Sequence, residues 1–130
     1  MVPRGERKGM EYMEHTEKPE LLESILNAYP YPIVFVDNDY KIRFMNRNAE
    51  YHYYQERGYS DLIGASIFEC HNNEKSVERI KTAYEGIKRN GKEVFIGVST
   101  RNLRIYIQGV RNSKGEWIGF FERFELNQQL

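Results

Sequence analysis

The residues best suited to chemistry are a neighbouring cysteine and histidine, Cys70 and His71, in the stretch FECHNNEKSVERI at residues 68–80. A thiolate beside an imidazole can form a nucleophilic pair, and an imidazole alone can hold a metal or a haem iron. Catalysis would require both groups to converge in space, but adjacent side chains in a turn usually point apart. Cys70 is the only cysteine, which excludes an internal disulfide and a multi-cysteine zinc site. We therefore expect no catalysis by this pair, and we expect that the protein is not an enzyme.

The residues after the pair fit the start of a helix. Asn72, Asn73 and Ser76 are favourable N-cap residues, and Glu74 suits the positive end of a helix dipole. His71 would then belong to a loop that leads into the helix. The alternative is that His71 coordinates a haem or another metal.

Composition limits the classes of function. The chain has 130 residues, 40% of them apolar, with 19 Lys+Arg against 19 Asp+Glu. A balanced charge favours neither nucleic acid nor a membrane surface as a partner. We find no apolar run of the roughly 18 residues that a membrane span needs, and no apolar core of a signal peptide. The sequence therefore predicts a cytoplasmic protein.

We expect a flexible N-terminal tail over residues 1–18 and a single domain over residues 19–130. The tail is polar and has no hydrophobic period. The domain would begin with an amphipathic helix, which the prolines of YPYP at 29–32 would end. The apolar stripe of that helix is formed by Leu22, Ile25 and Leu26.

Alternation of apolar with polar residues, with β-branched and aromatic enrichment, predicts five strands. They are expected near residues 33–36, 40–46, 93–99, 103–110 and 117–126. A helix is predicted from Val77 to a stop at Asn90-Gly91, and short helical turns over 48–64, with Ser60 as an N-cap and Ile63 facing inward. Grouped strands and grouped helices predict an α+β fold: a five-stranded antiparallel sheet with helices on one face.

These segments resemble the PAS domain family over about residues 21–126. The resemblance is carried by PIVFVDNDYKIRFMNRNAE, DLIGASIFEC, KRNGKEV and VRNSKGEWIGFFERF, in that order. It implies a sensory and protein-interaction module of bacterial signal transduction, which responds to a small ligand or a signalling protein by changing conformation. It also implies that the oxygen-sensing members carry their haem-binding histidine inside the long helix, where this chain has none. We expect no cofactor, with haem on His71 as the alternative.

In this architecture, a ligand cavity can form between the long helix and the sheet. We expect its lining to include Asn46, His71, Tyr84, Phe95, Arg104, Tyr106 and Phe120. Large rings on the outer sheet face and the apolar side of the first helix predict a homodimer. The expected interface residues are Leu22, Ile25, Leu26, Trp117 and Phe121.

Overall fold

The computed structural model describes residues 17–71 and 73–128. The chain divides into two compact units that meet at Pro30 and Tyr31. In the first unit, helix α2 spans Lys18–Ala28 and begins with a proline in its first turn. This helix lies where the sequence predicts one, and Leu22 and Ile25 on it are 49% and 57% exposed. Most of the predicted tail, residues 1–16, lies outside the described residues.

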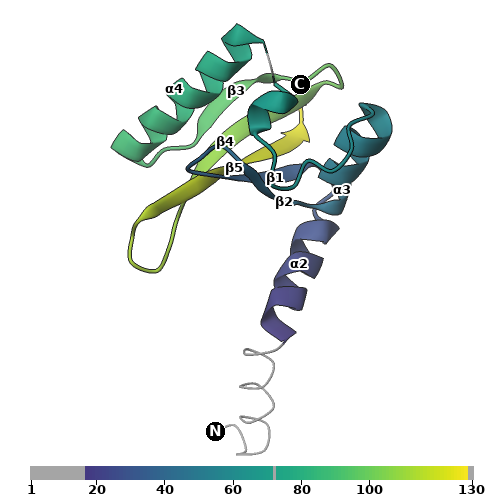
Figure 1. Ribbon diagram of the computed structural model, residues 1–130, viewed down its shortest axis with the longest axis horizontal. Helices are drawn as coiled ribbons and strands as arrows, with labels where there is room; N and C mark the ends of the chain where they lie inside the picture. The colour runs from purple at the N-terminus through teal and green to yellow at the C-terminus, as the bar shows by residue number, and fades with distance from the viewer. Residues whose placement is uncertain (1–16, 72, 129–130) are drawn as a thin grey trace, which may run out of the picture. The chain divides into compact units, whose positions relative to one another are not determined.

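The second unit is built on a five-stranded antiparallel sheet in the order β2-β1-β5-β4-β3 (Figure 1). The strands are β1 Ile33–Asp37, β2 Ile42–Met45, β3 Val94–Val98, β4 Leu103–Arg111 and β5 Trp117–Leu126. Strand β1 pairs with β2 on one side and with β5 on the other. The predicted five-stranded α+β fold is confirmed.

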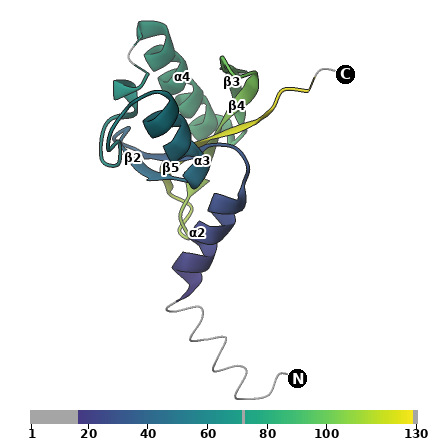
Figure 2. The same cartoon turned by 90° about the vertical axis from the view of Figure 1, so that its right-hand side faces the viewer.

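All the helices of this unit lie in the chain between β2 and β3. They are α3 Arg47–Glu50, the π-helix η2 Tyr51–Glu56, the 3₁₀ helix η3 Ile67–Glu69 and α4 Glu74–Asn90. Helix α4 packs beside β3 and β4, as both views show, and α3 contacts β1 and β2 (Figures 1 and 2). No helix among residues 17–71 and 73–128 is long and apolar enough to cross a bilayer.

Helix α4 shows how local signals set its ends and its buried face. The side chain of Asn73 accepts a hydrogen bond from the amide of Ser76 and caps the first turn, as predicted. Gly91 ends the helix with φ at 71°, a left-handed conformation that glycine adopts without strain. The buried side of α4 consists of Ile80, Ala83, Tyr84 and Ile87. These residues form the core with the inner face of the sheet, where Val36, Ile107 and Phe120 are fully buried.

The segment before η3 differs from the prediction. Ser60 does not begin a helix; Ser66 does, and its hydroxyl accepts a hydrogen bond from the amide of Phe68. Ile63 is 49% exposed, whereas Leu62 is buried. The positive φ values of Asp61 (40°) and Gly64 (86°) turn the backbone around Leu62, which no helical period describes.

Candidate functional site

One buried carboxylate marks the candidate site. Glu122 lies on β5, in register with Ile107 and Val34 on the two neighbouring strands, and all three are buried. The Glu122 side chain is 1% exposed, and its Oε1 atom has no hydrogen-bond partner among the described residues. Burying a charged oxygen without a partner is costly, so this position needs an explanation other than packing.

A histidine and a tyrosine lie beside this carboxylate. His71 Nε2 is 3.8 Å from Glu122 Oε1 and 3.3 Å from the hydroxyl of Tyr53. The first distance is too long for a hydrogen bond, so the nearest polar contact of Nε2 is Tyr53. Burial raises the pKa of Tyr53 well above its ordinary value, and the charge of Glu122 adds to this. The Tyr53 hydroxyl therefore stays protonated over the physiological pH range.

Cys70 is part of the packing beneath this cluster. Its side chain is buried, and Sγ donates to the carbonyl of Ile67 over 3.2 Å. Burial raises the pKa of the Cys70 thiol to about 12, and the charge of Glu122 acts in the same direction. The thiol is therefore protonated at neutral pH, and a protonated thiol is a poor nucleophile.

Glu122 and His71 line a cavity of about 140 Å³ between the start of α4 and strands β3, β4 and β5. We call this space the inner cavity. Its other polar side chains are Ser76 and Arg79, and its apolar lining comes from Ile80, Ile96, Val98 and Ile105. Gly97 completes the wall and adds no side chain.

A second, open groove of about 600 Å³ runs along α4 and β3. We call it the outer groove. Arg79 and Ile96 line both spaces. Arg79 Nη1 donates to the carbonyl of Ile96 over 3.1 Å, which holds the guanidinium at the shared wall. A cation therefore lies between the outer groove and the buried carboxylate of the inner cavity.

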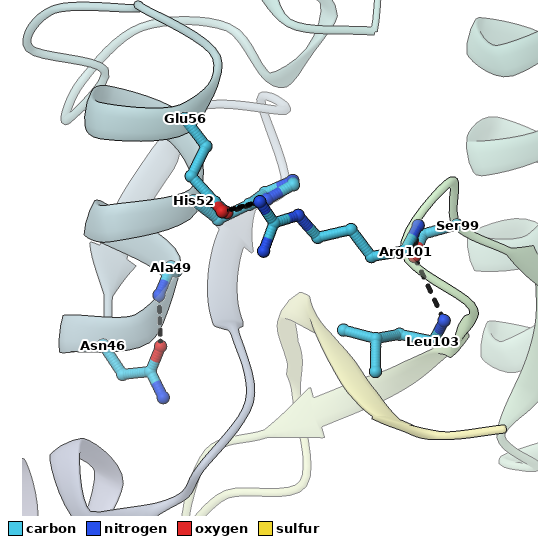
Figure 3. A network of polar contacts seen from close by, with 7 residues as sticks. All are labelled: Asn46, Ala49, His52, Glu56, Ser99, Arg101 and Leu103. Carbon is cyan, nitrogen blue, oxygen red and sulfur yellow. Dashed lines mark hydrogen bonds and ion pairs between the residues drawn. The ribbon is translucent and has the colours of Figure 1, made fainter. Parts of the chain in front are cut away.

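A second polar network joins η2 to the turn between β3 and β4 (Figure 3). Arg101 from that turn forms an ion pair with Glu56, and His52 Nδ1 lies 3.2 Å from Glu56 Oε1. Burial lowers the pKa of His52, and the charges of Arg57 and Arg101 lower it further. Arg101 already compensates the charge of Glu56, so this carboxylate does little to favour a protonated His52. Arg101 is distant from Glu56 in the sequence, so the sequence alone does not indicate this ion pair.

Asn46, a predicted lining residue, holds the backbone together instead of facing the inner cavity. Its Oδ1 accepts a hydrogen bond from the amide of Ala49 (Figure 3). The same oxygen accepts from the amide of Ile33, and Nδ2 donates to the carbonyl of Tyr31. Through these bonds Asn46 caps α3 and fixes the start of β1. The fully buried side chain therefore has a structural role that its geometry accounts for.

The other predicted lining residues are dispersed. Tyr84 and Phe120 pack ring to ring in the core at 5.0 Å, and the Tyr84 hydroxyl donates to Asn38 Oδ1 over 2.6 Å. Phe95, Arg104 and Tyr106 form a separate cluster, with the Phe95 and Tyr106 rings 5.5 Å apart and Arg104 Nε donating to the Tyr106 hydroxyl over 2.8 Å. Strand alternation places Arg104 and Tyr106 on the face opposite Ile105 and Ile107.

Of the seven predicted lining residues, His71 is the one that lines the inner cavity, and Phe95 borders the outer groove. Glu122 was missed, although the sequence holds a signal for it. In the segment FFERF, Glu122 alternates with Phe120 and Phe124, which are both buried. A glutamate in the buried row of a strand therefore indicates a polar feature in the core.

The predicted dimer residues need one correction. Phe121 is partly exposed and lies in register with Phe35 and Gln108, but Trp117 does not share its face. Trp117 packs against the core close to Ile87 and Gly109. A Cβ atom added to Gly109 would lie 2.5 Å from the side chains of both Ile87 and Trp117. The pairing of β4 with β5 shifts between Val110 and Arg111, so the simple alternation from Phe121 back to Trp117 fails.

The inner cavity does not fit haem. Sites for drug-sized ligands span roughly 300–1,000 Å³, and a porphyrin is at least as large as such ligands, against about 140 Å³ here. His71 Nε2, which would have to face the iron, contacts Tyr53, and the nearest charged group is a carboxylate. We therefore do not carry the haem hypothesis further.

The fold and the site define a class: a small α+β domain with an antiparallel sheet, helices packed over it and a partly polar cavity between them. The PAS domain family model matches residues 22–125. The chain belongs to the PAS domain family, as its sequence motifs predicted. A search of curated proteins gave no significant match.

Solved structures share this fold at low sequence identity. A C-terminal domain from Streptococcus mutans is 21% identical, with a TM-score of 0.61 and 82% of each chain covered. A sensory box sensor histidine kinase from Vibrio cholerae is 15% identical, with a TM-score of 0.58, covering 92% of this chain and 99% of its own. The histidine kinase ThkA, solved in complex with the response regulator TrrA, is 22% identical with a TM-score of 0.55, covering 78% of this chain and 30% of its own. These structures agree with the predicted fold, and the family match supports the general prediction of a PAS-type module.

Proposed function

We propose that this PAS domain binds a small ligand in the inner cavity and signals by a shift between two conformations of the surrounding elements. The observation that carries the proposal is Glu122 Oε1, a buried acceptor that lines a cavity and has no hydrogen bond from the part of the chain that the structure describes. Leaving such a group unsatisfied costs about 1–3 kcal/mol. A ligand that donates to Glu122 recovers part of this free energy only in the conformation that forms the cavity, and so it shifts the population toward that conformation.

The walls of the inner cavity provide routes for the signal. Strands β3 and β4 line the cavity, and the turn between them is tied to η2 by the ion pair of Arg101 with Glu56. A ligand-dependent movement of this turn would therefore also move η2. The ion pair joins elements that are distant in sequence, as a conformational relay requires.

We further propose that the output is read through a homodimer or a signalling protein. Support comes from exposed apolar side chains in both units: Leu22 and Ile25 on α2, and Phe95 on β3, which is 45% exposed. Among the proteins of similar fold, ThkA was solved with a response regulator, which is an example of such a partner. Sedimentation velocity at high micromolar concentration tests the homodimer, and a monomer at that concentration would contradict it.

We propose that Cys70 and His71 are not a catalytic pair: Cys70 packs in the core, and His71 lines the inner cavity. The thiol is buried and protonated at neutral pH, which supports this assignment. Alkylation by iodoacetamide at pH 7.5 should be much slower in the folded protein than in the same protein in denaturant. A folded-state rate equal to or above the denatured rate would favour a reactive nucleophile and overturn the assignment.

Native mass spectrometry tests the ligand proposal. Freshly purified protein should carry a bound small molecule, and Ser76→Phe should remove it, because Ser76 lines the inner cavity. Ser113→Phe is the matched control, since Ser113 is exposed in the turn between β4 and β5. Equal occupancy in Ser76→Phe and wild type, or no bound molecule before and after a small-molecule screen, would contradict the proposal.

A further inference from the structure

The buried carboxylate of the inner cavity favours a ligand with a cationic hydrogen-bond donor. Glu122 Oε1 accepts no hydrogen bond from residues 17–71 and 73–128, and His71 Nε2 is 3.8 Å away, near the Tyr53 hydroxyl. Carboxylates form their strongest hydrogen bonds with charged N–H donors. Such a ligand must bring its own ammonium group or a comparable donor to the floor of the cavity.

An exposed cation borders the same cavity. Arg79 lines the inner cavity and the outer groove, and its bond to the carbonyl of Ile96 uses one of the five N–H donors of a guanidinium. Arginine pairs with carboxylates in a bidentate manner. The cavity thus has a buried acceptor at one end and a cationic donor at the side that adjoins the groove.

The size of the cavity limits the ligand further. Its volume is about 140 Å³, whereas one water molecule occupies about 30 Å³ in the liquid. The space itself suits a molecule or group of roughly four to seven non-hydrogen atoms. The lining by Ile80, Ile96 and Ile105 favours an apolar middle.

We infer that the ligand of the inner cavity is a small amino acid, bound with its ammonium group on Glu122 and its carboxylate on Arg79. This inference rests on the proposed sensory function and names the ligand class for it. Water and simple amines could also occupy the cavity, because each can donate a hydrogen bond to Glu122. Only a zwitterion satisfies both ends of the cavity at once.

Four probes separate these cases, with amide chemical shifts of the full chain as the readout. L-Alanine and glycine carry both charges, ethylamine carries only the ammonium, and propionate carries only the carboxylate. Alanine or glycine should bind most tightly, ethylamine should bind more weakly, and propionate should not bind. The amino acids should shift the amide signals of residues 76–80, 96–98 and 122. Binding of propionate without binding of the amino acids, or no binding of either amino acid, would overturn the inference.

Variants then assign the two ends. Glu122→Gln should weaken alanine binding about tenfold or more, because the charged acceptor is lost. Arg79→Gln should weaken alanine but leave ethylamine unchanged. Glu125→Gln is the matched control, since Glu125 on the same strand is 41% exposed on the opposite face. Alanine binding that is equal in wild type and Glu122→Gln would overturn the inference.

The failure of this inference can be told apart from the failure of the sensory proposal. If fresh protein carries a different molecule that Ser76→Phe removes, the sensory proposal stands and the amino-acid inference falls. If neither the probes nor the native protein show occupancy of the inner cavity, both fall.

Discussion

Two buried polar residues of the second unit, Asn46 and Glu122, differ in how their hydrogen-bonding atoms are used. Asn46 is fully buried and bonds three backbone groups through its amide. Glu122 is 1% exposed and lies beside a cavity, and its Oε1 has no hydrogen bond within the described ranges 17–71 and 73–128. Equal burial thus accompanies opposite roles. Asn46 holds the fold together through its hydrogen bonds. Glu122 lowers the stability of the fold, and a ligand that donates a hydrogen bond to it would offset this cost.

The largest expected effect is on Asn46. Asn46→Ala leaves the amides of Ile33 and Ala49 and the carbonyl of Tyr31 without this partner, and should lower the free energy of unfolding by about 2–4 kcal/mol. Asn73→Ala, the loss of an exposed cap, should cost about 1 kcal/mol. Urea unfolding measures both. A smaller loss for Asn46 than for Asn73 would contradict the structural role of Asn46.

Replacement of Glu122 should change the free energy of unfolding in the opposite direction to replacement of Asn46. Glu122→Leu replaces an unsatisfied buried carboxylate with an apolar side chain, and we expect the free energy of unfolding to rise by about 1–3 kcal/mol. Glu125→Leu should change it by less than about 0.5 kcal/mol, because Glu125 is exposed. Urea unfolding of ligand-free protein is the measurement. A marked loss of stability in Glu122→Leu would show that Glu122 is satisfied in the native protein.

Tyr53 tests how firmly His71 is held next to Glu122. Tyr53→Phe removes the hydroxyl that lies 3.3 Å from His71 Nε2 and should cost about 0.5–1.5 kcal/mol. Tyr51→Phe is the control, since Tyr51 is 59% exposed. In the same samples, the NMR chemical shifts of the His71 ring should differ from wild type in Tyr53→Phe and equal those of wild type in Tyr51→Phe. Unchanged His71 signals in both variants would remove Tyr53 from the cluster.

The smallest effect concerns pH. The pKa of His52 in the folded protein lies below its ordinary value of 6.5, mainly because of burial. As the pH falls through that ordinary value, the unfolded chain binds a proton at His52 before the folded protein does, so the free energy of unfolding decreases. His52→Gln should reduce this decrease between pH 7.5 and 5.5. A steeper decrease in the variant would mean that Glu56 holds a protonated His52.

The sequence was sufficient for the positions of the five strands, for α4 and for its cap at Asn73, because these depend on local periodicity and turn chemistry. It did not give the order of the strands in the sheet. It was not sufficient for the site. Alternation shows that Glu122 shares a face with Phe120 and Phe124, but not that its Oε1 lacks a partner, which depends on residues far away in the chain. The π-helix η2 has no recognisable sequence pattern, and the shifted pairing near Trp117 invalidates a count of alternate residues.

Strand β1 lies in the sheet between its sequence neighbour β2 and the last strand, β5. About eighty residues must therefore be synthesised after β1 before its second edge can be covered. Until then, an apolar strand with unpaired amides is exposed on the nascent chain, which is a hazard for aggregation. The speed with which β5 docks should consequently govern how much of this protein reaches its native state during synthesis.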